Sequence, residues 1–205
     1  GLLVGVLREN KSGGASSIQT SLPARNIGLS GRFTYAYDGR YFAEANFGYN
    51  GSERFAKNER FGLFPSIGAG WMISEEKFWN QDLKNIINKL KLKGTYGLVG
   101  NDNIGAWNDR FFYMSEVNLN GSGANFSWGQ DFERNVGTID MIRYRNDKIK
   151  WEIAQKMNLG LEVGLFNIFD IQFDYFTEYR KNIFGERQTI PYEMGFSAPL
   201  FANKG

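Results

Sequence analysis

The chain has 205 residues, of which 42% are hydrophobic, and its 24 Lys and Arg against 22 Asp and Glu leave a formal net charge of +2. This near-neutral balance gives no electrostatic basis for binding nucleic acid. Cys and His are both absent, which excludes disulfides, thiolate and imidazole metal sites, and mechanisms that need a histidine base. An enzyme is therefore disfavoured, and we expect no catalytic residues, no cofactor and no bound metal.

The segment 29–50 alternates between apolar and polar residues on either side of a turn. Successive side chains of a strand point to opposite faces, so this period of two predicts strands near 26–37 and 40–50. Asp38 and Gly39 lie between them, and this dipeptide is typical of a two-residue type I′ hairpin. The residues on the apolar faces are Leu29, Gly31, Phe33, Tyr35, Tyr37, Tyr41, Ala43, Ala45, Phe47 and Tyr49.

The segment 60–88 predicts one more strand and a connection. Alternation over 60–73 indicates a strand, in which Pro65 cannot donate to a ladder, so we expect a bulge there. In the connection, Leu83 and Ile86 lie at helix-like spacing after the acidic 74–76 stretch. This spacing is compatible with a short helix over 81–88 or with a loop that contains one helical turn.

Further strands are predicted near 2–9, 89–98, 155–166 and 170–182, which makes about seven, and more strand is expected within 110–150. The stretch 89–98 is the clearest, because Lys89, Lys91 and Lys93 alternate with Leu90 and Leu92. Three ammonium groups on one face of a strand must meet water. The leucines on the other face must then be covered by an apolar environment.

The pattern favours an all-β fold, an antiparallel transmembrane β-barrel. The strands exceed the usual length of about five or six residues and reach the roughly nine to eleven that a tilted membrane-crossing strand needs. Aromatic residues gather toward strand ends, as in the girdles of outer-membrane barrels. Short connections at 38–39 and 167–169 alternate with long polar ones at 51–60 and 100–150, so we expect the short turns in the periplasm and the long loops outside the cell.

About seven strands do not make a complete barrel. Bacterial single-chain barrels have even strand numbers from about eight upward, and in hydrocarbon a sheet must close to pair all of its backbone groups. We therefore expect residues 1–205 to be part of one β-barrel domain, and the other strands to lie elsewhere in a longer chain or in a partner.

Several stretches carry a family resemblance. They are DGRYFAEANFGYNGSE at 38–53, RFGLFPSIGAGW at 60–71, SEEKF at 74–78, KLKLKGTYGLVGND at 89–102, WE at 151–152, NLGLE at 158–162 and DYF at 174–176. Their order and spacing resemble the SusC-like family of TonB-dependent outer-membrane transporters, over roughly 26–182. The family's N-terminal plug domain, TonB-binding segment and terminal closing strand have no counterpart among these residues.

The resemblance implies a multi-pass barrel in the cell outer membrane, with about 22 strands, in contact with lipid. It implies active import of a nutrient, above all a glycan or oligosaccharide and in some members an oligopeptide. The implied partners are a SusD-like surface lipoprotein that lids the barrel, the TonB complex that supplies energy through the N-terminal part, and the remainder of the barrel. Two other readings stay open, a passive porin-like barrel and a soluble carbohydrate-binding β-sandwich.

The alternation also assigns a polar set of residues to the inside of the barrel. Such residues are expected to contact the plug or the solute, or simply to be wetted. The set is Arg32, Glu44, Asn46, Lys91, Lys93, Lys156, Glu162, Gln172, Asp174, Glu178 and Arg180.

The long loop 100–150 carries the candidate ligand-binding residues. Trp rings stack on sugars and the polar groups of Asn and Asp bind hydroxyls, so this composition predicts contact with a solute. The same aromatic residues can instead hold the loop to itself or to the lid protein. The candidates are Asn101, Asp102, Asn103, Trp107, Asn108, Asp109, Tyr113 and Trp128.

Two further sites are excluded on the residues themselves. An EF-hand that starts near Asn101 would need Glu at its twelfth position, where the chain has Phe112, or Tyr113 if the loop starts one residue later. Adjacent Glu75 and Glu76 cannot flank a substrate as glycosidase carboxylates do, so we assign them to solvation or capping.

Overall fold

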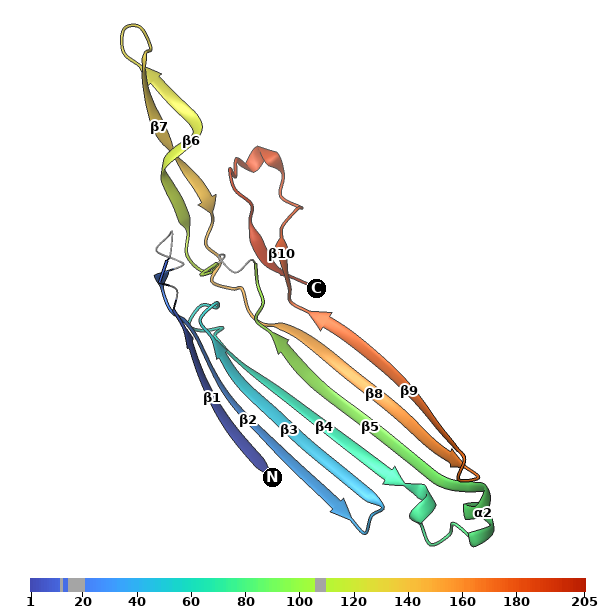
Figure 1. Ribbon diagram of the computed structural model, residues 1–205. Coiled ribbons are helices and arrows are strands. Elements are labelled where there is room, and N and C mark those ends of the chain that lie inside the picture. Colours follow the sequence, from blue (N-terminus) through green and yellow to red (C-terminus); the bar gives the residue numbers. More distant parts are fainter. Residues whose placement is uncertain (12, 15–20, 106–109) are drawn as a thin grey trace.

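The chain folds mainly into one antiparallel sheet. The computed structural model describes residues 1–11, 13–14, 21–105 and 110–205. Seven strands form the sheet in the order β1-β2-β3-β4-β5-β8-β9, which Figure 1 shows as a curved, open wall. They are β1 (Leu2–Asn10), β2 (Ala24–Tyr37), β3 (Tyr41–Ser52), β4 (Phe61–Met72), β5 (Ile87–Asn101), β8 (Glu152–Leu165) and β9 (Phe169–Lys181). The seven predicted strands are all confirmed, with ends displaced by three residues or fewer.

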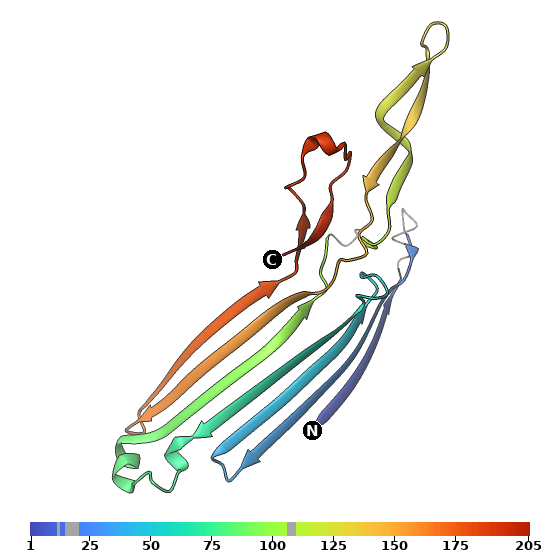
Figure 2. The same cartoon turned by 180° about the vertical axis from the view of Figure 1, so that it is seen from behind.

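The long connection between β5 and β8 contains a second sheet. β6 (Glu116–Trp128) and β7 (Arg134–Arg143) pair as a hairpin, which confirms the strand expected within 110–150. Figures 1 and 2 both show this hairpin projecting away from the end of the seven-stranded sheet. After β9, β10 (Ile183–Glu186) and β11 (Phe201–Lys204) pair with each other, and the 3-10 helix η2 (Tyr192–Met194) lies between them in sequence.

The connection between β4 and β5 is partly helical. It contains the 3-10 helix η1 (Ile73–Glu75) and the short helix α2 (Gln81–Ile86). The helical alternative for this segment is confirmed, although residues 87 and 88 already belong to β5. Within the described ranges, no helix combines the length and the apolar character needed to cross a membrane.

Tight turns join neighbouring strands at one end of the sheet, the short-turn end. Asp38 and Gly39 have φ angles of 53° and 64°, so the predicted type I′ hairpin is confirmed. Between β8 and β9 the two left-handed residues are Phe166 and Asn167, at 54° and 56°. The turn expected at 167–169 therefore starts one residue earlier, because two consecutive positive φ angles match the twist of the flanking strands. The opposite end of the sheet, where 53–60 and 102–151 emerge, is the long-loop end.

The expected bulge at Pro65 is wrong. The β3–β4 register runs through Pro65 without a shift, and Phe47 is its partner. The β4–β5 ladder ends at the pair Ser66↔Gly97, directly beside the proline. Because β4 no longer pairs with β5 at Pro65, no donor is needed on that side.

One face of the sheet is apolar from strand to strand. The registers align Tyr41, Trp71, Leu92, Leu161 and Phe173 in a single row across five strands. In the described part of the chain, element contacts run mainly between neighbouring strands, and no second sheet packs over this row. A β-sandwich would bury such a row between two sheets, so the β-sandwich alternative is wrong. The row fits a surface that faces hydrocarbon.

The most deeply buried apolar side chains lie at the long-loop end. The rings of Phe55 and Phe64 each have their centroids 5.2 Å from Trp151, whose indole N–H donates to the Arg60 carbonyl at 3.1 Å. A Cβ atom at Gly100 would lie 2.0 Å from the Phe64 ring, so glycine is required for this close approach. We call this group the loop cluster: Phe55, Phe64, Ile104, Phe112, Ile149 and Trp151.

Glu76 links the ends of two strands by hydrogen bonds at the short-turn end. Its carboxylate accepts hydrogen bonds from the Tyr41 hydroxyl at 2.5 Å and from Trp71 and Arg40 at 3.0 Å each, and its side chain is only 10% exposed. The hydrogen bond from Tyr41, followed by that from Trp71 and by the nearby Arg40 charge, lowers the pKa of Glu76 against the opposing effect of burial. One carboxylate thus joins β3 and β4 to the connection that follows them.

Arginine should be tolerated very differently on the two faces of the sheet. Leu161 of β8 lies in the apolar row, whereas Thr95 of β5 lies on the polar face of the sheet. A cationic residue facing lipid at the bilayer midplane costs about 2–4 kcal/mol. We expect Leu161→Arg to lower the folded fraction of the full-length protein in outer membranes, measured by heat-modifiable gel migration, and Thr95→Arg to stay close to wild type. Equal losses in the two variants would mean that the faces are assigned wrongly.

Glu76→Gln should remove a pH-dependent part of the stability. A carboxylate whose folded pKa is lowered stabilises the fold above its unfolded pKa of about 4.3, and this contribution is lost as the pH falls through the folded pKa. Thermal midpoints of the full-length protein in detergent should differ between wild type and Glu76→Gln at neutral pH and converge in acid. Glu75→Gln is the control, because Glu75 is 52% exposed and pairs with Lys84 at 3.3 Å. A midpoint lowered as much by Glu75→Gln would contradict the linking role of Glu76.

Candidate functional site

The face opposite the apolar row is lined by ion pairs. Lys93 Nζ lies 3.2 Å from Glu162 and 3.4 Å from Asp174, and Lys89 Nζ lies 2.8 Å from the second oxygen of Glu162. A Cβ at Gly160 would collide with Lys93 and Asp174, so the absence of a side chain there makes room for this network. The other pairs on this face are Arg32–Glu44, Lys156–Glu178, Arg180–Glu178 and Arg180–Glu152. The predicted sorting of charge onto one face is confirmed.

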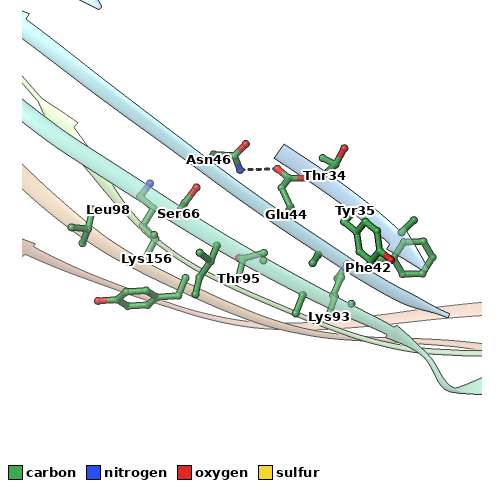
Figure 3. A pocket seen from close by; sticks show the side chains of 18 of the residues that line it. Thr34, Tyr35, Phe42, Glu44, Asn46, Ser66, Lys93, Thr95, Leu98 and Lys156 are labelled. Atoms are coloured by element: carbon green, nitrogen blue, oxygen red, sulfur yellow. Dashed lines mark hydrogen bonds between the residues drawn. The ribbon is translucent and has the colours of Figure 1, made fainter. Parts of the chain in front are cut away.

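The centre of the polar face is hollowed, as Figure 3 shows. The cavity has a volume of about 710 Å³ and is lined from β2, β3, β4, β5 and β8. Its polar lining is Thr34, Glu44, Asn46, Ser66, Lys91, Lys93, Thr95 and Lys156. Asn46 donates to Glu44 at 2.7 Å, the dashed line in Figure 3. The lining carries one carboxylate and three ammonium groups, and two of these, Lys93 and Lys156, are paired with carboxylates of β8 and β9.

Aromatic side chains interrupt this polar lining. The Lys91 ammonium lies 5.1 Å from the centroid of the Phe42 ring, a cation–π contact. Phe176 of β9 pairs with Asn158 and is 75% exposed on the same face. In the part of the chain that the structure describes, no three metal-ligating side chains gather. The face therefore offers hydrogen bonds and aromatic contacts.

Asn101, Asp102 and Asn103 lie where β5 leaves the sheet, and other side chains hold them there. Arg54 donates to the Asp102 carbonyl and to the Asn103 side chain, each at 3.3 Å. Asn26 donates to the Asp102 carboxylate at 3.3 Å, and the Asn103 backbone N–H donates to Asn101 Oδ1 at 3.0 Å. The side chains of Asn101 and Asn103 are exposed at the long-loop end.

The remaining candidates are not gathered at one place. Tyr113 is partly buried beside Phe111, with ring centroids 5.8 Å apart, and burial raises the pKa of its hydroxyl. Trp128 is 54% exposed and is the last residue of β6. Figure 1 shows the tip of the β6–β7 hairpin far from the end of β5, so Trp128 and the 101–103 stretch are separated. Trp107, Asn108 and Asp109 lie outside the described residues.

Other loop aromatics hold the loop to its surroundings, which is the alternative left open by the sequence. Phe112 is 2% exposed, and its ring centroid lies 4.7 Å from that of Phe184 and 5.3 Å from that of Phe201. The Arg143 guanidinium lies 4.7 Å from the Phe112 ring centroid and 3.1 Å from Glu116. These contacts join the base of the β6–β7 hairpin to the β10–β11 sheet.

Sequence reasoning missed the arginines that organise the long-loop end. Arg54 contacts the 102–104 backbone, and Arg110 donates to the carbonyls of Leu22 and Pro23 at 2.8 and 2.9 Å. Their acceptors are backbone oxygens 48 to 88 residues away. No local spacing marks such a contact, so the sequence carries no signal for it.

Comparison with known proteins gives consistent relatives. No family model matches the chain. It is 33% identical over 151 residues to the TonB-dependent receptor SusC of Bacteroides thetaiotaomicron, covering 73% of this chain and 14% of that one. It is 30% identical over 176 residues to the TonB-dependent receptor P39 of Formosa agariphila, covering 82% and 15%. The chain thus spans less than a fifth of the length of these curated relatives.

Solved structures share the fold. The chain superposes on the RagAB peptide importer in its 'closed-closed' state with a TM-score of 0.68 and 22% identity, covering 93% of this chain and 20% of that one. In the 'open-open' state of the same importer the TM-score is 0.68, with 24% identity and coverage of 94% and 20%. The two-faced seven-stranded sheet and these relatives agree: the chain belongs to the SusC-like family of TonB-dependent receptors and is a segment of its antiparallel outer-membrane β-barrel.

Proposed function

We propose that the complete protein imports a nutrient across the outer membrane with energy supplied through TonB. Residues 1–205 supply part of its barrel domain, and the plug domain and the TonB-binding segment belong to other parts of the polypeptide. The observation that carries the proposal is the division of the sheet into an apolar row and a hollowed, ion-paired face. An internal wall of this kind suits a wet passage for a polar solute. The protein acts as a transporter and not as an enzyme.

The long-loop end is proposed to face the outside and to receive a SusD-like surface lipoprotein. The loop cluster and Arg54 hold the long connections at this end in contact with one another. The packed loops give a lid protein a defined surface to bind. The short-turn end, with the hairpin at Asp38 and Gly39, then faces the periplasm. Solute contacts are proposed at this rim from Asn101, Asp102, Asn103 and Tyr113, with Trp107, Asn108 and Asp109, and further out on the β6–β7 hairpin from Trp128.

A glycan or oligosaccharide is the proposed solute. The exposed Trp128 and the exposed amides of Asn101 and Asn103 are the groups that bind sugar rings and hydroxyls. An oligopeptide is the second candidate, because the solved structures that share the fold are named as a peptide importer. A passive porin-like barrel differs from both, since it would need no TonB.

Uptake by the full-length protein should require TonB. We expect cells that depend on this gene to take up labelled oligosaccharides or labelled oligopeptides, and to lose uptake when either the gene or tonB is deleted. Whether the oligosaccharides or the oligopeptides are taken up identifies the chemical class of the solute. Uptake that survives deletion of tonB but not of the gene would support the passive barrel and contradict active import.

Trp128→Ala should weaken solute binding without affecting folding. An aromatic contact contributes about 0.5–1.5 kcal/mol beyond its area, which corresponds to about two- to tenfold weaker binding. The control is Trp151→Ala, because Trp151 is 8% exposed in the loop cluster and its loss should lower the thermal midpoint instead. Solute binding by the purified full-length protein, measured calorimetrically, checks the pair. Unchanged affinity in Trp128→Ala would remove this residue from the site.

A further inference from the structure

Apolar side chains on the polar face stand singly on β3 and β9, at Phe42 and Phe176, but on β1 three of them follow one another. Leu2, Val4 and Val6 of β1 pair with Arg32, Ser30 and Gly28 of β2, so their side chains project from the same face as the ion pairs. They are 63%, 39% and 53% exposed. We call these three residues the β1 strip.

The β1 strip contrasts with the rest of its face. On β5, β8 and β9 the same face carries Lys93, Glu162 and Asp174 in a connected set of ion pairs. β1 is apolar on both faces, because Leu3 and Leu7 occupy the opposite one. A strand with lipid on one side and water on the other would alternate apolar and polar residues, so both faces of β1 meet apolar surroundings.

The neighbouring strands leave room beside the strip. Ser30 pairs with Val4 on one side and with Gly48 of β3 on the other. Because these two residues are small, the surface of the sheet is lower here than at the neighbouring apolar side chains. A packed element could therefore approach the backbone of β2 and β3 closely while it covers Val4 and Val6.

The position of the strip limits what can cover it. A further barrel strand would pair with the edge of β1 and lie beside it in the plane of the sheet. It would not cover the side chains of the strip, which project from the face of the sheet. Lipid cannot reach the inside of a closed barrel. The chain spans 14% to 19% of its curated relatives, so in a protein of that length most of the polypeptide lies outside this segment and can supply a covering domain.

We infer that the β1 strip is the docking surface for an apolar patch on a domain of the same polypeptide that lies inside the barrel. The ion-paired wall of β5, β8 and β9 then stays hydrated and bounds the open side of the lumen. The inference deepens the proposed import function and rests on it, with the sheet as part of a closed barrel in the full-length protein. It assigns separate roles to the two halves of the inner face: β1 and β2 hold the internal domain, and β5 to β9 line the passage.

Photo-crosslinking tests the docking directly. p-Benzoylphenylalanine is placed at Val4 of the full-length protein in outer membranes, with Leu3 on the opposite face and Thr95 on the hydrated wall as controls. In the heat-modifiable, folded fraction, Val4 should give intramolecular adducts to peptides outside 1–205 that are not barrel strands. Leu3 should give lipid adducts, and Thr95 a several-fold lower yield of intramolecular adducts. No intramolecular adduct from Val4, or equal yields from Val4 and Thr95, would overturn the inference.

A paired substitution provides the second readout. Val4→Asn with Val6→Asn should loosen the internal domain and increase the entry of a large antibiotic such as vancomycin several-fold, whereas Gln172→Asn, on the same face of β9, should not. A folded double variant that excludes the antibiotic as well as wild type would contradict the docking role. Failure of the import proposal looks different: wild-type uptake would be independent of TonB while the Val4 adducts persist.

Discussion

Exposing an Arg or Lys side chain to hydrocarbon at the bilayer midplane costs about 2–4 kcal/mol. This cost determines which face of the sheet can meet lipid. Side chains alternate between the two faces along a strand, so the face on which Lys93 lies fixes the faces of its neighbours on β5. Residues paired across strands share a face, so the register extends this assignment to the neighbouring strands. Glu162 and Asp174 meet Lys93 on one side, and Leu92 and Leu161 adjoin each other on the other.

The two ends of the sheet are stabilised by different means. At the short-turn end a single carboxylate, Glu76, accepts hydrogen bonds from the ends of two strands. At the long-loop end, aromatic packing around Trp151 and backbone contacts from Arg54 hold the loops together. The sheet between the two ends has little internal core, because its apolar row is exposed on one face and ion pairs line the other.

Much of the fold could be predicted because the alternation of residues reports the environment of each face. All seven strands and the hairpin at Asp38 and Gly39 followed from that period and from turn chemistry. The turn at Phe166 did not, since a bulky residue with positive φ carries no local signature. At Pro65 the sequence predicted a bulge, but the early end of the β4–β5 ladder removes the need for one.

The candidate site was less predictable than the fold. Composition identified a loop rich in Trp, Asn and Asp, but it could not tell that Phe112 is buried among aromatic rings while Trp128 projects at the end of β6. Those positions depend on contacts between segments far apart in the sequence. The position of the β1 strip likewise could not be predicted, because it is the register that places Val4 on the polar face.

A spin-label scan of residues 156–164 would show whether one face of the sheet meets lipid and the other meets water. Labels would be introduced one at a time into the full-length protein in lipid bilayers, and their collision rates with oxygen and with a water-soluble nickel complex compared. We expect oxygen maxima at the odd positions, such as Leu159 and Leu161, and nickel maxima at the even ones, such as Lys156 and Glu162. Two profiles that rise and fall together, or that do not alternate, would contradict this assignment of the faces.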